Sequence, residues 1–214
     1  MKVKYIILIN IILIALWLVA KNVVPTTHNY DLNLTVAEDV PPEMIEEVKK
    51  AVEFFPNQII ETFSENDWKI VLLRDFDDAE GYEHVACDSS VVGLIHFSNK
   101  TITIRGVSEY NNTARDIMIH ELCHFVDRLW DSESNSKELL ALLEKYKDGK
   151  YRTFAYAGIE LSDTYKADLL DATSNRQEFF AEAMKDYLLH PEYLKENYPD
   201  IHDYFRMLFI KQDW

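Results

Sequence analysis

The segment IHELCHFVD, residues 119–127, places two histidines and a glutamate within a run that is otherwise almost wholly apolar and that contains the pattern H-E-x-x-H. If this segment is a helix, His120 and His124 lie about one turn apart and their imidazoles face the same way. Two imidazole nitrogens on one helix face can bind a metal ion at about 2.0–2.1 Å. Glu121 lies beside that face, where it can take a proton from a metal-bound water molecule.

The residues around the motif predict that this helix is buried. Its apolar members are Ile117, Met118, Ile119, Leu122, Cys123, Phe125 and Val126. Burying two histidines and a glutamate without partners would cost several kcal/mol, and a divalent metal ion relieves that cost. The alternative is an exposed helix that carries H-E-x-x-H by chance, and the apolar surroundings argue against it. Thr113, with Asp116 three residues later, predicts where the helix begins.

A second segment supplies a candidate third ligand. The predicted helix 176–189 carries Glu178 and Glu182 four residues apart, among phenylalanines. A catalytic zinc commonly has three protein ligands, and two histidines with one glutamate is a standard set. Glu178 is therefore the candidate third ligand, and Glu182 could accept a hydrogen bond from the far nitrogen of a ligating histidine. The alternative is that both glutamates are solvated charges. Ser174 and Gln177 predict the start of this helix.

The two segments HELCHFVD and NRQEFFAEA together resemble the catalytic domain of anthrax lethal factor and the secreted Pro-Pro endopeptidases, which are zincin metalloproteases. The resemblance covers residues 39–214. It implies an α+β, zincin-like domain with a small mixed sheet, a central H-E-x-x-H helix and a mostly helical C-terminal half. It also implies that His120, His124 and Glu178 bind one zinc ion per chain. Glu121 is then the general base.

The resemblance extends to further residues, and the chain departs from the family at two positions. Asp127 matches the family's aspartate after the second histidine, where it either lies behind the metal ligands or is a helix-surface acid. Cys123 stands where the family usually has glycine. The family's oxyanion-stabilising tyrosine, seven residues before the ligating glutamate, is replaced by Asp171. Tyr165 or Tyr156 could substitute for it, although with twelve tyrosines in the chain each has packing as its alternative role. Losing one oxyanion donor typically lowers the rate about 10²–10³-fold.

Composition limits the class of protein. The chain has 214 residues, 48% of them apolar, and no internal repeat, which favours a single globular domain. Its formal net charge of −15 repels phosphates, so we expect no nucleic acid partner. Two cysteines are too few for a disulfide framework. A buried free thiol is the default for Cys123, and a bridge between Cys87 and Cys123 remains open. We expect a monomer that acts on a peptide or protein substrate.

The amino terminus predicts export. Residues 5–20 form an apolar run with Asn10 as its one clearly polar member, preceded by Lys2 and Lys4. A basic start followed by such a run is typical of a signal peptide or a short uncleaved anchor. The catalytic domain would then be secreted, or extracellular and attached to the membrane only through residues 5–20. Residues 21–38 are expected to be a linker to the domain.

The remaining pattern predicts helices, then a small sheet, then mostly helices, which is an α+β order. Expected helices span residues 41–55, 57–63, 136–147 and 199–210; expected strands span 68–73, 91–97 and 101–106, the last two forming a hairpin around 98–100; and a loop spans 148–173.

The leading hypothesis is an exported zinc endopeptidase whose sheet-edge strand binds substrate backbone by strand addition. A second hypothesis is a zinc-holding cell-surface domain that binds a protein partner without cleaving it, which Asp171 favours and the intact Glu121 opposes. A third, a cytoplasmic H-E-x-x-H protease, conflicts with the predicted export segment.

Overall fold

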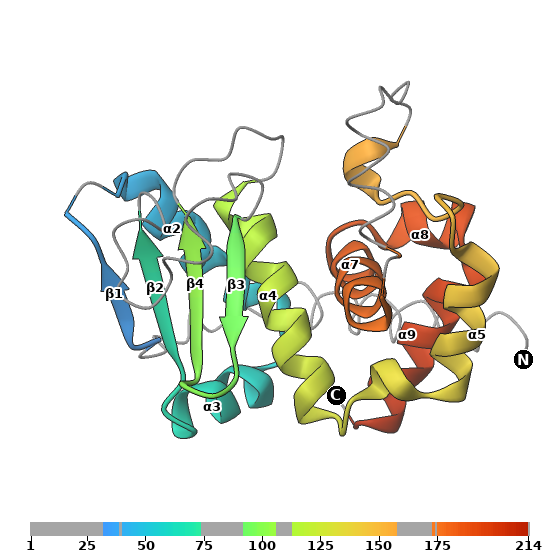
Figure 1. Ribbon diagram of the computed structural model, residues 1–214, viewed down its shortest axis with the longest axis horizontal. Helices are drawn as coiled ribbons and strands as arrows, with labels where there is room; N and C mark the ends of the chain where they lie inside the picture. Colours follow the sequence, from blue (N-terminus) through green and yellow to red (C-terminus); the bar gives the residue numbers. More distant parts are fainter. Residues whose placement is uncertain are drawn as a thin grey trace, which may run out of the picture. The chain divides into compact units, whose positions relative to one another are not determined.

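The computed structural model describes residues 32–38, 40–73, 92–105, 113–157, 173 and 175–213. Within them lies a mixed sheet with strand order β1-β2-β4-β3 (Figure 1). Its strands are β1 (Leu34–Val36), β2 (Lys69–Leu73), β3 (Gly93–His96) and β4 (Thr101–Arg105). β1 is parallel to β2 and β2 is parallel to β4, whereas β3 is antiparallel to β4. β3 and β1 are therefore the two edges of the sheet.

Apolar residues of the two central strands form the centre of the sheet. Ile70 pairs with Ile102 and Leu72 with Ile104, and all four side chains are fully buried. Alternate residues of a strand share a face, so the four lie on the same side of the sheet. Burial of each such side chain contributes roughly 1.5–3 kcal/mol.

The predicted hairpin is present, with a longer turn than the sequence suggested. β3 and β4 are joined by residues 97–100, because Phe97 leaves the strand and packs edge-on against Trp68 at 5.6 Å. Lys100 adopts a left-handed backbone conformation with φ 54°, which turns the chain into β4.

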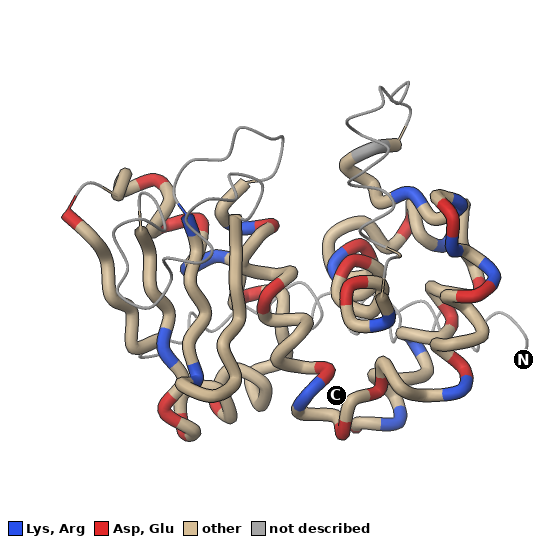
Figure 2. The backbone as a smooth tube through the Cα atoms, viewed as in Figure 1, with Lys and Arg blue, Asp and Glu red and all other residues tan. Residues whose placement is uncertain are grey.

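The helices cover most of the remaining described chain. They are α2 (Pro42–Ala51), α3 (Asn57–Glu65), α4 (Ala114–Leu129), α5 (Lys137–Tyr146), α7 (Arg176–Leu189), α8 (Pro191–Asn197) and α9 (Pro199–Lys211), with short 3-10 turns η1 (Val52–Phe54), η3 (Glu133–Asn135) and η4 (Phe154–Tyr156). The α+β class, with its small mixed sheet and mostly helical C-terminal half, is confirmed. Lys and Arg are interspersed with Asp and Glu along these helices (Figure 2).

Helix α4, which carries the motif, lies between the sheet and the C-terminal helices (Figure 1). Thr113 caps its start as predicted, because the Thr113 hydroxyl accepts a hydrogen bond from the Asp116 amide at 3.3 Å. On the sheet side, Phe125 packs edge-on against Phe63 and Trp68, with ring centroids 5.2 Å and 5.1 Å apart. These aromatic contacts join α4 to α3 and to the start of β2, and so hold the motif helix against the sheet.

Helix α7 is anchored in the C-terminal half by buried aromatic residues and one buried carboxylate. Phe179 packs against Tyr151 at 5.5 Å, and Phe180 packs against Phe205 of α9 at 5.4 Å. Asp186, which is 2% exposed, accepts a hydrogen bond from the Tyr151 hydroxyl at 2.7 Å. These contacts fix the face that α7 turns toward α4.

Three local predictions need correction. Leu34–Val36, assigned to the linker 21–38, forms β1, with Leu34 opposite Ile70. Helix α7 is capped by Asn175, whose side-chain oxygen accepts from the Gln177 and Glu178 amides at 2.9 and 3.0 Å, and not by the predicted Ser174. No helix was predicted between residues 189 and 199, whereas α8 begins at Pro191 and ends at Asn197.

The predicted export segment, residues 5–20, lies outside the described residues. Among the helices that the structure does describe, none combines the length and the apolar character needed to cross a bilayer.

Candidate metal centre

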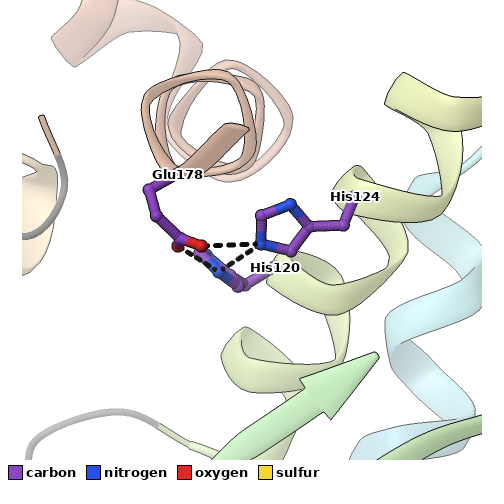
Figure 3. A group of neighbouring side chains, drawn as sticks. All are labelled: His120, His124 and Glu178. Carbon is purple, nitrogen blue, oxygen red and sulfur yellow. Dashed lines mark hydrogen bonds and ion pairs between the residues drawn. The ribbon is translucent and has the colours of Figure 1, made fainter. Parts of the chain in front are cut away.

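Helices α4 and α7 bring together the three side chains that the sequence assigned as metal ligands (Figure 3). His120 Nε2 lies 3.1 Å from His124 Nε2 and 3.2 Å from Glu178 Oε2. Glu178 Oε1 lies 3.5 Å from His124 Nε2. Their ligand atoms all lie within 4.8 Å of one another, so this group could hold a metal ion.

Local structure explains why the three groups meet. His120 and His124 are one turn apart on α4, and their rings stand edge to face with centroids 4.7 Å apart. Glu178 follows the Asn175 cap and lies in the first turn of α7. The positive end of the helix dipole favours a carboxylate at that place.

The separations fit a tetrahedral metal ion. With bonds of about 2.0–2.1 Å, two ligand atoms of tetrahedral zinc lie about 3.3 Å apart. The distances of 3.1, 3.2 and 3.5 Å between the three pairs of groups bracket this value. Three protein ligands leave one tetrahedral position open, which is typical of catalytic rather than structural zinc.

Glu182 lies behind His120, one turn after Glu178 on α7. Its Oε1 lies 2.8 Å from His120 Nδ1, the nitrogen on the far side of the ring. The same oxygen lies 2.8 Å from Lys185 Nζ, and the Lys185 side chain is only 9% exposed. The structure therefore places Glu182 where the sequence expected a carboxylate that orients a ligating imidazole. Lys185, which the sequence analysis did not single out, balances its charge.

The charges at this site favour a bound cation. Burial lowers the pKa of His120, but hydrogen bonds to Glu178 and Glu182 outweigh it and raise the pKa to about 10. Burial raises the pKa of Glu178, yet hydrogen bonds with His120 and His124 bring it well below its usual range. Burial also raises the pKa of Glu182, and the Lys185 charge and the His120 hydrogen bond outweigh it, giving a pKa of about 2. Two ionised carboxylates thus hold a positive charge at His120, and a metal ion bound here would replace the proton that His120 otherwise carries.

Glu121 occupies a different environment from the two carboxylates of α7. It is 6% exposed and lies on α4 against the edge strand β3, where it is the neighbour of Gly93. Burial raises its pKa above the ordinary value, against the opposing influence of His120 and His124. A carboxylate with a raised pKa is a better proton acceptor than an exposed one, which suits a general base.

Asp127 holds the chain after α4. Its two carboxylate oxygens accept hydrogen bonds from the Ser134 amide and the Ser134 hydroxyl, both at 2.7 Å, and it is 5% exposed. Between these residues Asp131 and Ser132 both have positive φ, at 57° and 62°. The alternative of a helix-surface acid is therefore wrong, and these hydrogen bonds hold the turn into η3.

The structure describes only some of the other residues that the sequence suggested for the site. Cys123 is buried and free, and burial raises its pKa well above the ordinary value. Its possible partner Cys87 lies outside the described residues, as do Tyr165 and Asp171. The backbone of Tyr156 lies in η4, and its side chain is outside the described part.

Gly93 is a second residue that the sequence analysis did not single out. An isolated glycine inside a strand pattern is a sign of close backbone approach, so the run VVGLIHF held a usable signal. The sequence indicates a role for Lys185 less clearly, because a lysine three residues after a glutamate usually forms an ion pair with it on the helix surface.

The fold is similar to that of a known peptidase. The structure of the Pro-Pro endopeptidase PPEP-2 from Paenibacillus alvei matches this chain with a TM-score of 0.58 and 19% sequence identity. The match covers 84% of this chain and 99% of that chain. It shows that the two proteins share a fold. No protein-family model and no curated protein sequence matches this chain.

Proposed function

We propose that this chain is an exported zinc-dependent endopeptidase. The observation that carries the proposal is that His120, His124 and Glu178 converge from two helices that are far apart in the sequence. The buried Glu121 lies on the flank of the same motif. Two imidazoles and one carboxylate form a common ligand set for catalytic zinc. A structural zinc site needs no base, so the placement of Glu121 favours catalysis.

The residues of the chain divide the chemistry between them. His120, His124 and Glu178 would hold the zinc ion, and Glu182 orients the His120 ring. When bound, zinc supplies a Lewis acid for peptide hydrolysis. Glu121 removes a proton from the attacking water and delivers it to the leaving amine.

The edge strand β3 offers a place for the substrate backbone. The hydrogen bond from the Arg105 amide to the Val92 carbonyl, at 2.9 Å, marks these two residues as a hydrogen-bonded pair. Such pairs alternate along antiparallel strands. Gly93 and Ile95 therefore turn their backbone N–H and C=O groups away from β4, toward the edge of the sheet. An extended peptide could pair with these groups by strand addition.

Replacement of the base tests the assignment. In the full chain, Glu121→Gln should abolish cleavage of peptides from a diverse library while zinc remains bound at one ion per chain. Glu121 is not among the converging ligand atoms, so the metal site should survive the change. Retained cleavage by this variant would contradict the proposed role of Glu121.

The alternative is a zinc-binding cell-surface domain with impaired catalysis. Asp171 at the position of the resembling family's tyrosine favours it. A peptide library incubated with the wild-type chain, with and without a chelator, separates the two. Cleavage that the chelator stops supports the enzyme, whereas bound zinc without any cleavage supports the binding domain.

The substrate and the location are part of the same proposal. We propose that the substrate is a peptide or protein, and a library that includes Pro-Pro bonds tests whether the specificity in the structural neighbour's name extends to this chain. We propose that residues 5–20 direct the chain out of the cytoplasm. Cell fractionation that finds the full chain in the cytosol would contradict this part.

A further inference from the structure

We propose that Gly93 is a positioning residue for Glu121: the bare backbone of the edge strand packs against the Glu121 side chain and fixes where its carboxylate lies. The inference rests on the proposed function, since it takes Glu121 to be the base. Strand β3, which would bind substrate, would then also fix the position of the base.

A side chain at position 93 would crowd atoms of Glu121 and Ile117, which would have to shift. A Cβ atom at this position would lie 2.6 Å from Glu121 Oε1, 3.1 Å from Glu121 Cγ and 2.7 Å from Ile117 Cγ2. Favourable contacts between non-bonded carbon atoms lie near 3.5–4.0 Å. Gly93 lies in a strand, and among the described glycines only Gly149 has positive φ, so the requirement comes from space and not from backbone conformation.

The two crowded neighbours differ in how easily they can move. Ile117 is β-branched, lies within α4 and is 5% exposed, so its rotamer is restricted and its surroundings are filled. The Glu121 carboxylate is the far end of a flexible side chain. The contact with Glu121 Oε1 is therefore relieved by displacement of the carboxylate, whereas the contact with Ile117 Cγ2 requires a small shift of β3 against α4.

Displacement of a base is costly to the reaction and much less so to the fold. A general base must lie within about 2.6–3.2 Å of the proton it accepts, and a misplacement of about 1 Å can lower a rate about 10²-fold. The three atoms nearest to such a Cβ belong to Glu121 and Ile117, and none of them belongs to His120, His124 or Glu178. The metal site should therefore survive a substitution that disables the base.

The test is Gly93→Ala in the full chain, measured by zinc affinity, by cleavage of the library peptide that the wild-type chain cuts best, and by a crystal structure of the zinc-loaded variant. We expect kcat to fall about 100-fold or more with KM nearly unchanged. Zinc affinity should stay within about threefold of wild type, and the crystal structure should show the Glu121 carboxylate displaced. Wild-type kcat, or an unmoved carboxylate, would overturn the proposal.

A double-mutant cycle separates positioning from a purely structural role. If Gly93 acts through the Glu121 carboxylate, Glu121→Asp should cost less activity in the Gly93→Ala background than in the wild type. Equal costs in the two backgrounds would overturn the proposal. If Gly93→Ala alone folds poorly, the test uses Gly93→Ala combined with Ile117→Ala. This double variant removes the contact with Ile117 and retains the contact with Glu121. Full activity of the double variant would also contradict the proposal.

Failure of the inference and failure of the proposed function are distinguishable. If the wild-type chain cuts no peptide, the proposed function fails, and the position of the Glu121 carboxylate in zinc-loaded Gly93→Ala still decides the steric claim. If the wild-type chain cuts peptides and Gly93→Ala cuts them equally well, the proposed function stands and the inference fails.

Discussion

Removal of the Glu182 charge should weaken both the metal site and the fold, by separable mechanisms. Glu182 Oε1 lies 2.8 Å from His120 Nδ1 and 2.8 Å from Lys185 Nζ, so one oxygen atom serves the imidazole and the buried lysine together. Glu182→Gln keeps an oxygen of similar shape at this point and removes the charge. The His120 ring loses a carboxylate charge 2.8 Å from its Nδ1, and Lys185 loses its counter-ion.

The two expected effects have different sizes. Loss of a carboxylate that orients a metal-binding histidine typically lowers metal affinity 10–100-fold, or about 1.4–2.7 kcal/mol. Neutralising one partner of a buried ion pair costs about 3–5 kcal/mol of stability. The glutamine oxygen can still accept from Lys185, so we expect a loss near the lower end, about 3 kcal/mol.

The assay measures each effect alone. Urea unfolding of the metal-free chain, followed by tryptophan fluorescence, gives the stability change without a contribution from metal binding. Competition with a chelator gives the zinc affinity. The matched control is Glu182→Gln combined with Lys185→Met, which makes the buried pair neutral. This double variant should regain most of the lost stability and keep the weakened zinc affinity. Restoration of zinc affinity in the double variant, or wild-type affinity in Glu182→Gln, would refute the assigned role of Glu182.

Three further predictions concern stability. Burial raises the pKa of Asp186 from 3.8 to about 7. Protonated Asp186 therefore stabilises the folded state fully below pH 3.8, and this stabilisation is lost as pH rises through 7. Asp186→Asn should flatten the fall in the free energy of unfolding between about pH 5 and pH 8, measured by urea unfolding. Asp127→Ala removes two hydrogen bonds to Ser134 and should cost about 3 kcal/mol while zinc affinity stays within threefold of wild type. Chelation of zinc from the loaded chain should lower Tm, and in a chain with Glu178→Gln the chelator should change Tm far less.

The sequence was most informative where the pattern was local. H-E-x-x-H on a helix fixes the relative placement of His120 and His124, because the helical repeat alone sets it. The hairpin and the capped start of α4 also depend on neighbouring residues. The fold class followed from the order of these elements.

Features that depend on distant contacts were missed. β1 has three residues, too few for a periodic pattern, and it exists because Leu34 can pair with Ile70. The role of Asp127 depends on a turn in which Asp131 and Ser132 have left-handed backbone conformations. No sequence motif predicted this turn. Lys185 is buried only because α7 packs against α4, and that packing is not visible in the sequence around it.

The central claim is that two imidazoles of α4 and one carboxylate of α7 bind a single zinc ion. The X-ray absorption spectrum of the zinc-loaded full chain at the zinc edge tests it most directly. We predict one zinc per chain with nitrogen and oxygen neighbours at about 2.0–2.2 Å, including two imidazoles. A sulfur neighbour near 2.3 Å, which would implicate Cys123, or a purified chain that retains no zinc, would contradict the account.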